Sequence, residues 1–142
     1  MKNLKHIHIG HLIKERVYEL DIDISRICKF LNIMEKDLEL IYKAKSIDSE
    51  LLLKWSKLLE YDFFRLYSQH LILYAPQSGN PEMGNKIKTQ LPLFKKNIYT
   101  RELIDFILER VRKGEMSKLQ VIEEYKIPKT TLYKWINKYD NK

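Results

Sequence analysis

The C-terminal part of the chain carries side chains suited to binding phosphates and base edges, at helical spacing. In YKIPKTTLYKWINKY, residues 125–139, apolar residues recur at i, i+3, i+4 and i+7, the pattern of one stripe of an amphipathic helix. Lysine ammoniums neutralise phosphates, whereas threonine hydroxyls and asparagine amides bind phosphates or base edges. The predicted chemistry is the binding of nucleic acid. Its candidate residues are Lys129, Thr130, Thr131, Tyr133, Lys134, Asn137 and Lys138.

The same stretch also fits a purely structural helix. Tyr133 lies off the apolar stripe, where it suits stacking or hydrogen bonding at DNA and equally suits partial packing against the protein. An ordinary amphipathic helix with a solvated basic face has this pattern too. A DNA-binding surface and a solvated surface are therefore both consistent with these residues.

A second, shorter helix is predicted just before this one. Ser117 and Gln120 have the spacing of a capping box, which predicts the start of a helix, and Leu119 and Tyr125 fall on its apolar side. Pro128 suits the first position of the next helix, because the N–H that proline lacks has no partner there. A short helix, a tight turn and a helix with a narrow apolar stripe is the pattern of a helix-turn-helix, whose second helix enters the major groove.

The distribution of charge favours a polyanionic partner. The chain has 142 residues and a net charge of +7, of which residues 1–75 contribute +1 and residues 76–97 and 98–142 contribute +3 each. Such a concentration attracts nucleic acid, although an ordinary solvated surface has the same composition. Hydrophobic residues make up 44% of the chain, which is enough for a folded core.

Helical periodicity dominates the chain, and strand signals are nearly absent. Five helices are predicted in the N-terminal part, with Asp48 and Asp62 as caps of the fourth and fifth. Their apolar stripes include Leu20, Ile24, Cys28, Met34 and Trp55. In the C-terminal part, a helix resumes at residue 100 and ends where residue 114, a glycine, suits the left-handed conformation.

Between these parts lies APQSGNPEMGNKIKTQLP, which holds three of the four prolines and has little periodicity, as is typical of a linker. We therefore predict an all-α protein of two small helical domains, with five helices at residues 1–75 and three at residues 98–142, joined by a linker at 76–97.

The C-terminal stretch resembles a known class of domain. YTRELIDFILERVRKGEMSKLQVIEEYKIPKTTLYKWINKY looks like the N-terminal helix-turn-helix of bacterial insertion-sequence transposases, through its KGE turn and its EYKIP and TLYKWI segments. The resemblance implies that Ser117–Tyr125 is the supporting helix and Pro128–Tyr139 the recognition helix. It also implies that the candidate residues from Lys129 to Asn137 face the groove.

Residues 9–75 resemble the five-helix domain of lambda repressor and Cro, through IGHLIKERVYE, ISRICKFLNI and SIDSELLLKWSKLLEYDFFRLYS. The resemblance implies that Ile24–Leu31 is the first helix of the motif and Met34–Tyr42 the recognition helix. That second helix departs from the pattern, because MEKDLELIYKAK places three carboxylates where a phosphate-facing surface favours neutral or basic residues. Either this domain contacts DNA weakly through Lys36, Lys43 and Lys45, or it is a retained fold that binds protein, including a second copy of itself.

Other reactive residues are not arranged for catalysis. His6, His8 and His11 offer nitrogen ligands, but no cysteine or carboxylate nearby completes a metal site. Transposases cut DNA with clustered carboxylates on two metal ions, and only the linker is left once two helical domains are assigned. No phosphate-binding glycine loop is present either. We expect no catalytic residue, no metal and no cofactor.

The expected location is the cytoplasm. No stretch approaches the roughly 20 apolar residues of a membrane-spanning helix, and the N-terminal segment lacks the apolar run of a secretory signal. The single cysteine, Cys28, cannot form an internal disulfide, and its place on an apolar stripe predicts a small buried side chain.

Together these patterns favour sequence-specific binding of double-stranded DNA by a bacterial transcriptional regulator or by the DNA-binding component of a transposable element. The alternative is a protein-interaction or oligomerisation module with residual affinity for nucleic acid. In that alternative, the N-terminal domain forms a homodimer or binds a partner protein.

Overall fold

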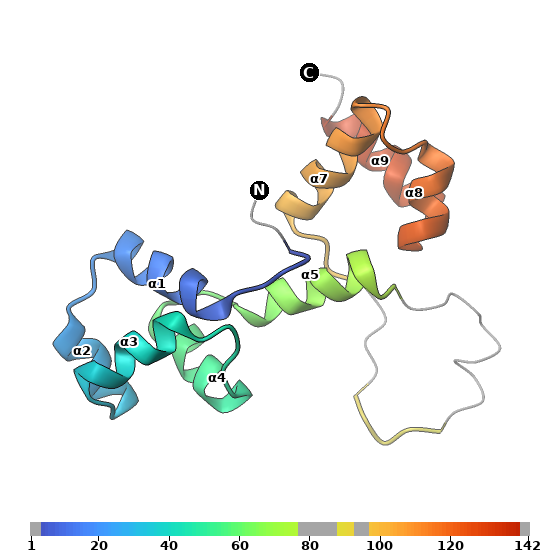
Figure 1. Cartoon of the computed structure of the whole chain (residues 1–142). Helices are drawn as coiled ribbons and strands as arrows, with labels where there is room; N and C mark the ends of the chain where they lie inside the picture. Colours follow the sequence, from blue (N-terminus) through green and yellow to red (C-terminus); the bar gives the residue numbers. More distant parts are fainter. Residues whose placement is uncertain (1–3, 77–87, 93–96, 140–142) are drawn as a thin grey trace. The chain divides into compact units, whose positions relative to one another are not determined.

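The computed structural model describes residues 4–76, 88–92 and 97–139, and within these ranges the chain forms eight helices and no strand (Figure 1). The prediction of an all-α fold is confirmed. The chain divides into an N-terminal unit that ends at Tyr67 and a C-terminal unit that begins at Ser68. Most of the expected linker, at 77–87 and 93–96, lies outside the described residues.

The N-terminal unit is built on four helices and the start of a fifth. Aspartates begin two of them as predicted, because Asp48 Oδ1 accepts the N–H of Leu51 at 2.8 Å and Asp62 Oδ1 accepts the N–H of Arg65 at 3.2 Å. Trp55 is fully buried at the centre of the core. The elements are α1 (Ile9–Leu20), α2 (Ile24–Leu31), α3 (Glu35–Lys43), α4 (Ser49–Leu58) and α5 (Phe64–Tyr74).

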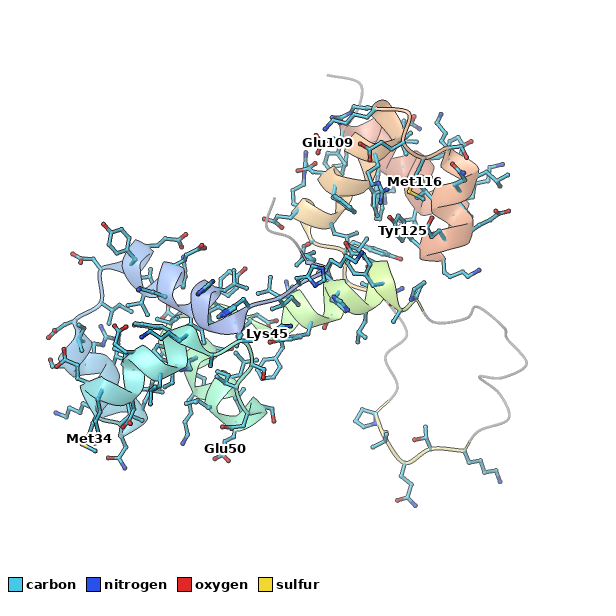
Figure 2. The ribbon with its side chains drawn as sticks, in the orientation of Figure 1. Met34, Lys45, Glu50, Glu109, Met116 and Tyr125 are labelled. Atoms are coloured by element: carbon cyan, nitrogen blue, oxygen red, sulfur yellow. The ribbon has the colours of Figure 1, made fainter. Side chains whose placement is uncertain are left out.

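The first turn of α1 is held against the end of α3. The N–H of Ile9 donates to the carbonyl of Lys45, labelled in Figure 2, and the N–H of Gly10 donates to the carbonyl of Ala44, each at 3.1 Å. A Cβ on Gly10 would lie 2.6 Å from the carbonyl oxygens of Ala44 and Tyr42. Only glycine therefore allows the two backbones to approach this closely.

The C-terminal unit contains α7 (Arg101–Arg112), α8 (Lys118–Tyr125) and α9 (Lys129–Tyr139), and α9 packs against both α7 and α8 (Figure 1). The second half of α5 belongs to this unit as well, whereas the sequence placed residues up to 75 in the first domain.

The side chain of Gln69 explains why the end of α5 belongs with α7. Gln69 is 1% exposed, and its Oε1 accepts the N–H of Thr100 at 3.1 Å and the hydroxyl of Thr100 at 3.3 Å. Its Nε2 donates to the carbonyl of Ile98 at 2.5 Å. A buried amide needs such partners to offset its desolvation, so these bonds tie α5 to the residues that begin α7.

Four residues expected on apolar stripes are exposed instead, and one of them is Ile24, which is 44% exposed as the first residue of α2. Leu20 is 40% exposed because it is the last residue of α1, and Met34 is 59% exposed because it is the N-cap of α3 rather than part of the helix (Figure 2). Leu119 is 63% exposed because α8 turns Val121 and Tyr125 inward. The predicted stripes were wrong at these positions, all at or near helix ends.

Cys28 also differs from the prediction of a buried side chain. It is half-buried, because the fully inward positions of α2 are Ile27 and Leu31. Its thiol therefore flanks the core of the N-terminal unit rather than lying inside it.

Tyr42 is expected to make stability fall at high pH. Burial, together with the neighbouring Glu39 and Cys28, raises the pKa of Tyr42 to about 12. The folded chain then holds the phenol proton more tightly than the unfolded chain, whose tyrosines have a pKa of about 10. This contribution to stability is complete below about pH 10 and is lost as the pH rises to about 12.

The measurement is urea denaturation from about pH 9 to about pH 12, for the wild type and Tyr42→Phe. We expect the free energy of unfolding to fall less steeply with pH in the variant, which lacks the ionisable phenol. Parallel curves for the two proteins would show that another group causes the loss of stability.

Candidate nucleic-acid interface

Local hydrogen bonds define the start of α8 as the sequence predicts. The Oγ of Ser117 accepts the N–H of Gln120 at 3.1 Å, and Gln120 Oε1 accepts the N–H of Ser117 at 2.7 Å, so the capping box is present. Gly114 precedes it with a φ of 71°, in the left-handed region expected for the end of α7.

A three-residue turn joins α8 to α9. Helix α8 ends at Tyr125, and Lys126 follows it with a left-handed φ of 54°. Helix α9 begins at Lys129, one residue later than predicted, and the carbonyl of Pro128 accepts the N–H of Leu132 at 3.1 Å. Pro128 thus occupies the position before the helix, where its missing N–H costs nothing.

Buried side chains hold α9 in a fixed rotation about its axis. Leu132 is fully buried and Trp135 is 7% exposed, as the apolar stripe predicts. The ring of Trp135 meets that of Tyr99 edge to face, with centroids 4.9 Å apart. The opposite side of α9 must therefore face outward.

Polar contacts fix α8 against the end of α7. Tyr125, labelled in Figure 2, is 4% exposed, and its hydroxyl accepts from Arg110 Nη1 at 3.0 Å. Arg110 Nε also pairs with Glu115 Oε2 at 3.2 Å. Burial raises the pKa of Tyr125, and the adjacent Arg110 guanidinium opposes that rise. The hydrogen bond from Arg110 to Tyr125 joins the end of α7 to the end of α8.

The outward side of α9 presents most of the residues that the sequence selected. Thr131 is half-buried, at the edge of this side. Positions 130, 133, 134 and 137 have the i, i+3, i+4, i+7 spacing of a single helical face. The exposed residues are Lys129, Thr130, Tyr133, Lys134, Asn137 and Lys138.

The basic side chains of α7 and of α9 differ in whether they form ion pairs. On α7, Arg101 pairs with Asp105 at 2.9 Å, and Glu109 pairs with Lys113, the C-cap of the helix, at 2.7 Å. The Lys113 ammonium lowers the pKa of the Glu109 carboxyl through this hydrogen bond. The three lysines of α9 form no ion pair with any residue that the structure describes. Among the described residues, no carboxylate neutralises their charge.

Lys118 is a basic residue beside this surface that the sequence did not single out. It is the first residue of α8, and its Nζ lies 5.3 Å from the centroid of the Tyr133 ring. In the sequence it appears only as an interior position of the capping box. Its proximity to α9 depends on how the two helices pack, which no local pattern reports.

The N-terminal candidates lie on α3 and just after it. Lys36, Lys43 and Lys45 are all exposed. Of the three carboxylates in this stretch, Asp37 forms a hydrogen bond at the start of α3, where its Oδ2 accepts the N–H of Met34 at 3.1 Å. The other two are exposed beside the lysines, so this surface is of mixed charge.

Two of the histidines near the N-terminus, His8 and His11, have a structural role. Nδ1 of His8 accepts the N–H of His11 at 3.3 Å and caps α1, and the two rings stack with centroids 3.7 Å apart. Across the described ranges, no group of three or more histidine, cysteine, aspartate or glutamate residues is placed to hold a metal ion.

Comparison with known proteins adds no relative. No protein-family model, curated protein or solved structure matches the chain. Among the helices that the structure describes, none combines the length and the apolar character needed to cross a membrane.

Proposed function

We propose that the C-terminal unit binds double-stranded DNA, with α8 and α9 acting as a helix-turn-helix and α9 as the recognition helix. The protein would serve in the cytoplasm of a bacterium as a transcriptional regulator or as the DNA-binding component of a transposable element. Lysines 129, 134 and 138 would contact phosphates, while Thr130 and Asn137 would contact phosphates or base edges.

The observation that carries this proposal is that the lysines of α9 form no ion pair with any residue that the structure describes. These lysines are exposed, whereas basic residues of α7 are neutralised by acidic neighbours. The rotation of α9 also supports it, because burial of Leu132 and Trp135 turns hydroxyls, an amide and ammoniums to the same side. A helix that presents these groups together suits the major groove.

Replacing Lys129, Lys134 and Lys138 by alanine is expected to weaken DNA binding in a salt-dependent way. Each lost phosphate contact removes counterion release, so the slope of log K against log salt should fall in magnitude by about one per lysine, or about three in the triple variant. The affinity of the full chain is measured at several salt concentrations on a duplex selected from a random pool.

The matched variant replaces Lys36, Lys43 and Lys45, which removes the same charge from the N-terminal unit. If the N-terminal unit contacts DNA, the salt slope of this variant falls in magnitude as well. If that unit binds protein instead, the salt slope of this variant equals that of the wild type. A wild-type slope in the α9 variant would place the DNA surface elsewhere.

A second function is favoured for the N-terminal unit by its exposed apolar side chains. Phe30 on α2 is 50% exposed. Met34, at the start of α3, is 59% exposed, and Leu40, on α3, is 67% exposed. Together with the exposed carboxylates of Glu35 and Glu39, they suit contact with protein better than contact with phosphates. Self-association that persists at high salt, measured by sedimentation, would support this function.

A further inference from the structure

Lysines of two different helices lie over the ring of Tyr133. Nζ of Lys118, on α8, is 5.3 Å from the ring centroid, and Nζ of Lys129, on α9, is 5.7 Å from it. Both lysines are exposed, and Tyr133 is 39% exposed. An ammonium is attracted to the electron-rich face of an aromatic ring, so Tyr133 brings the two charges to one place on the surface.

Among the described residues, no acidic side chain compensates these two charges. Neither lysine has an ion pair among the described residues. Both Nζ atoms lie within 5.7 Å of one ring centroid, so the two ammoniums repel each other, although salt screens this repulsion. An anion beside Tyr133 would relieve this repulsion. Contact with a ring face also leaves N–H groups of each ammonium free to donate to that anion.

We propose that Lys118, Lys129 and Tyr133 form a binding site for the phosphodiester groups of a nucleic-acid backbone. The site rests on the proposed function and adds to it a contact from α8, outside the recognition helix. Lysine binds phosphate as a point charge, and two lysines from different helices fix the backbone relative to both. Tyr133 is a positioning residue, because its ring holds the two ammoniums.

The first experiment measures the affinity of the full chain for a duplex of about two helical turns, roughly 20 base pairs, at several salt concentrations. Lys118→Ala is expected to lower the magnitude of the salt slope by about one. Lys113→Ala is the matched control, because it removes the same charge from a lysine that pairs with Glu109 at 2.7 Å. The slope of this control should equal that of the wild type.

Tyr133 is tested with two substitutions. Tyr133→Phe keeps the ring and should bind like the wild type, whereas Tyr133→Leu loses both cation–π contacts and should bind more weakly with a smaller salt slope. Because Tyr133 lies on the exposed side of α9, both variants should fold. Equal slopes for leucine and phenylalanine would remove Tyr133 from the site.

A second experiment needs no DNA. Inorganic pyrophosphate is titrated into the full chain while the ring resonances of Tyr133 are followed by NMR. We expect shifts in the wild type that are absent from the Lys118→Ala/Lys129→Ala double variant.

The two experiments separate the site from the proposed function. Duplex binding with an unchanged slope in Lys118→Ala overturns the site and leaves the proposed function standing. Failure of the wild type to bind duplex overturns the proposed function. In that case, pyrophosphate shifts that the double variant lacks would still support the site, and their absence would overturn it.

Discussion

Trp135→Ala is expected to destabilise the C-terminal unit by about 3–5 kcal/mol, the usual cost of deleting a buried indole. Trp135 is 7% exposed and packs edge to face on Tyr99. The substitution leaves a cavity between α9 and the segment that precedes α7. Small domains have only about 5–15 kcal/mol of stability in total, so a large fraction of that stability would be lost.

Each unit has its own tryptophan, which allows the measurement to be assigned. Trp135 lies in the C-terminal unit and Trp55 in the N-terminal unit. Urea denaturation followed by far-UV circular dichroism should show the C-terminal helices of Trp135→Ala unfolding at lower urea than those of the wild type, while the fluorescence of Trp55 should report an unchanged N-terminal unit. Trp135→Phe, which keeps an aromatic ring against Tyr99, is the control and should lose less.

The opposite result would be informative about α9. A Trp135→Ala protein that is as stable as the wild type and binds DNA less tightly would mean that Trp135 belongs to the DNA surface. The rotation of α9 described above would then be incorrect.

Gly10→Ala is expected to destabilise the N-terminal unit by about 3 kcal/mol or more, at or beyond the upper end of the range for overpacking. The new Cβ would lie 2.6 Å from the carbonyl oxygens of Tyr42 and Ala44 and would also clash with that of Ile41. These are backbone atoms, so no side chain can move aside. Either α1 or the end of α3 must shift, and the hydrogen bonds from Ile9 and Gly10 would be strained.

Helix propensity alone predicts that Gly10→Ala stabilises the N-terminal unit. Alanine is favoured over glycine by about 1 kcal/mol inside a helix, so a gain in stability would show that the close approach of α1 to α3 is absent. Gly114→Ala is the comparison, because nothing lies within 4 Å of its added Cβ and only its φ of 71° is unfavourable. Its expected cost is about 1–2 kcal/mol. Thermal denaturation of the two variants, followed at the tryptophan of each unit, measures both effects.

Local patterns in the sequence predicted the helices well, because helix starts depend on nearby residues. The caps at Asp48, Asp62 and Ser117 involve partners only three residues away. The apolar stripes likewise identified Trp55 and Trp135 as buried. The same rules were wrong at Met34 and Leu119, which are exposed near the starts of their helices. An apolar stripe does not show which residues near a helix end are buried.

The outward side of α9 was also predictable. Once Leu132 and Trp135 are buried, the geometry of a helix turns Lys134 and Asn137 to the other side. Whether that surface binds DNA stays a prediction, because a basic exposed face does not by itself identify its partner.

Tertiary structure decided the contacts between residues distant in sequence. Gln69 accepts from Thr100, 31 positions later, and so assigns the end of α5 to the C-terminal unit. Gly10 meets the carbonyls at the end of α3, and Lys118 reaches the ring of Tyr133. Periodicity and capping rules describe residues a few positions apart, whereas these contacts arise only when helices pack. The sequence by itself therefore determined the helices and their inward sides, and packing alone determined which helices meet and which charges come together.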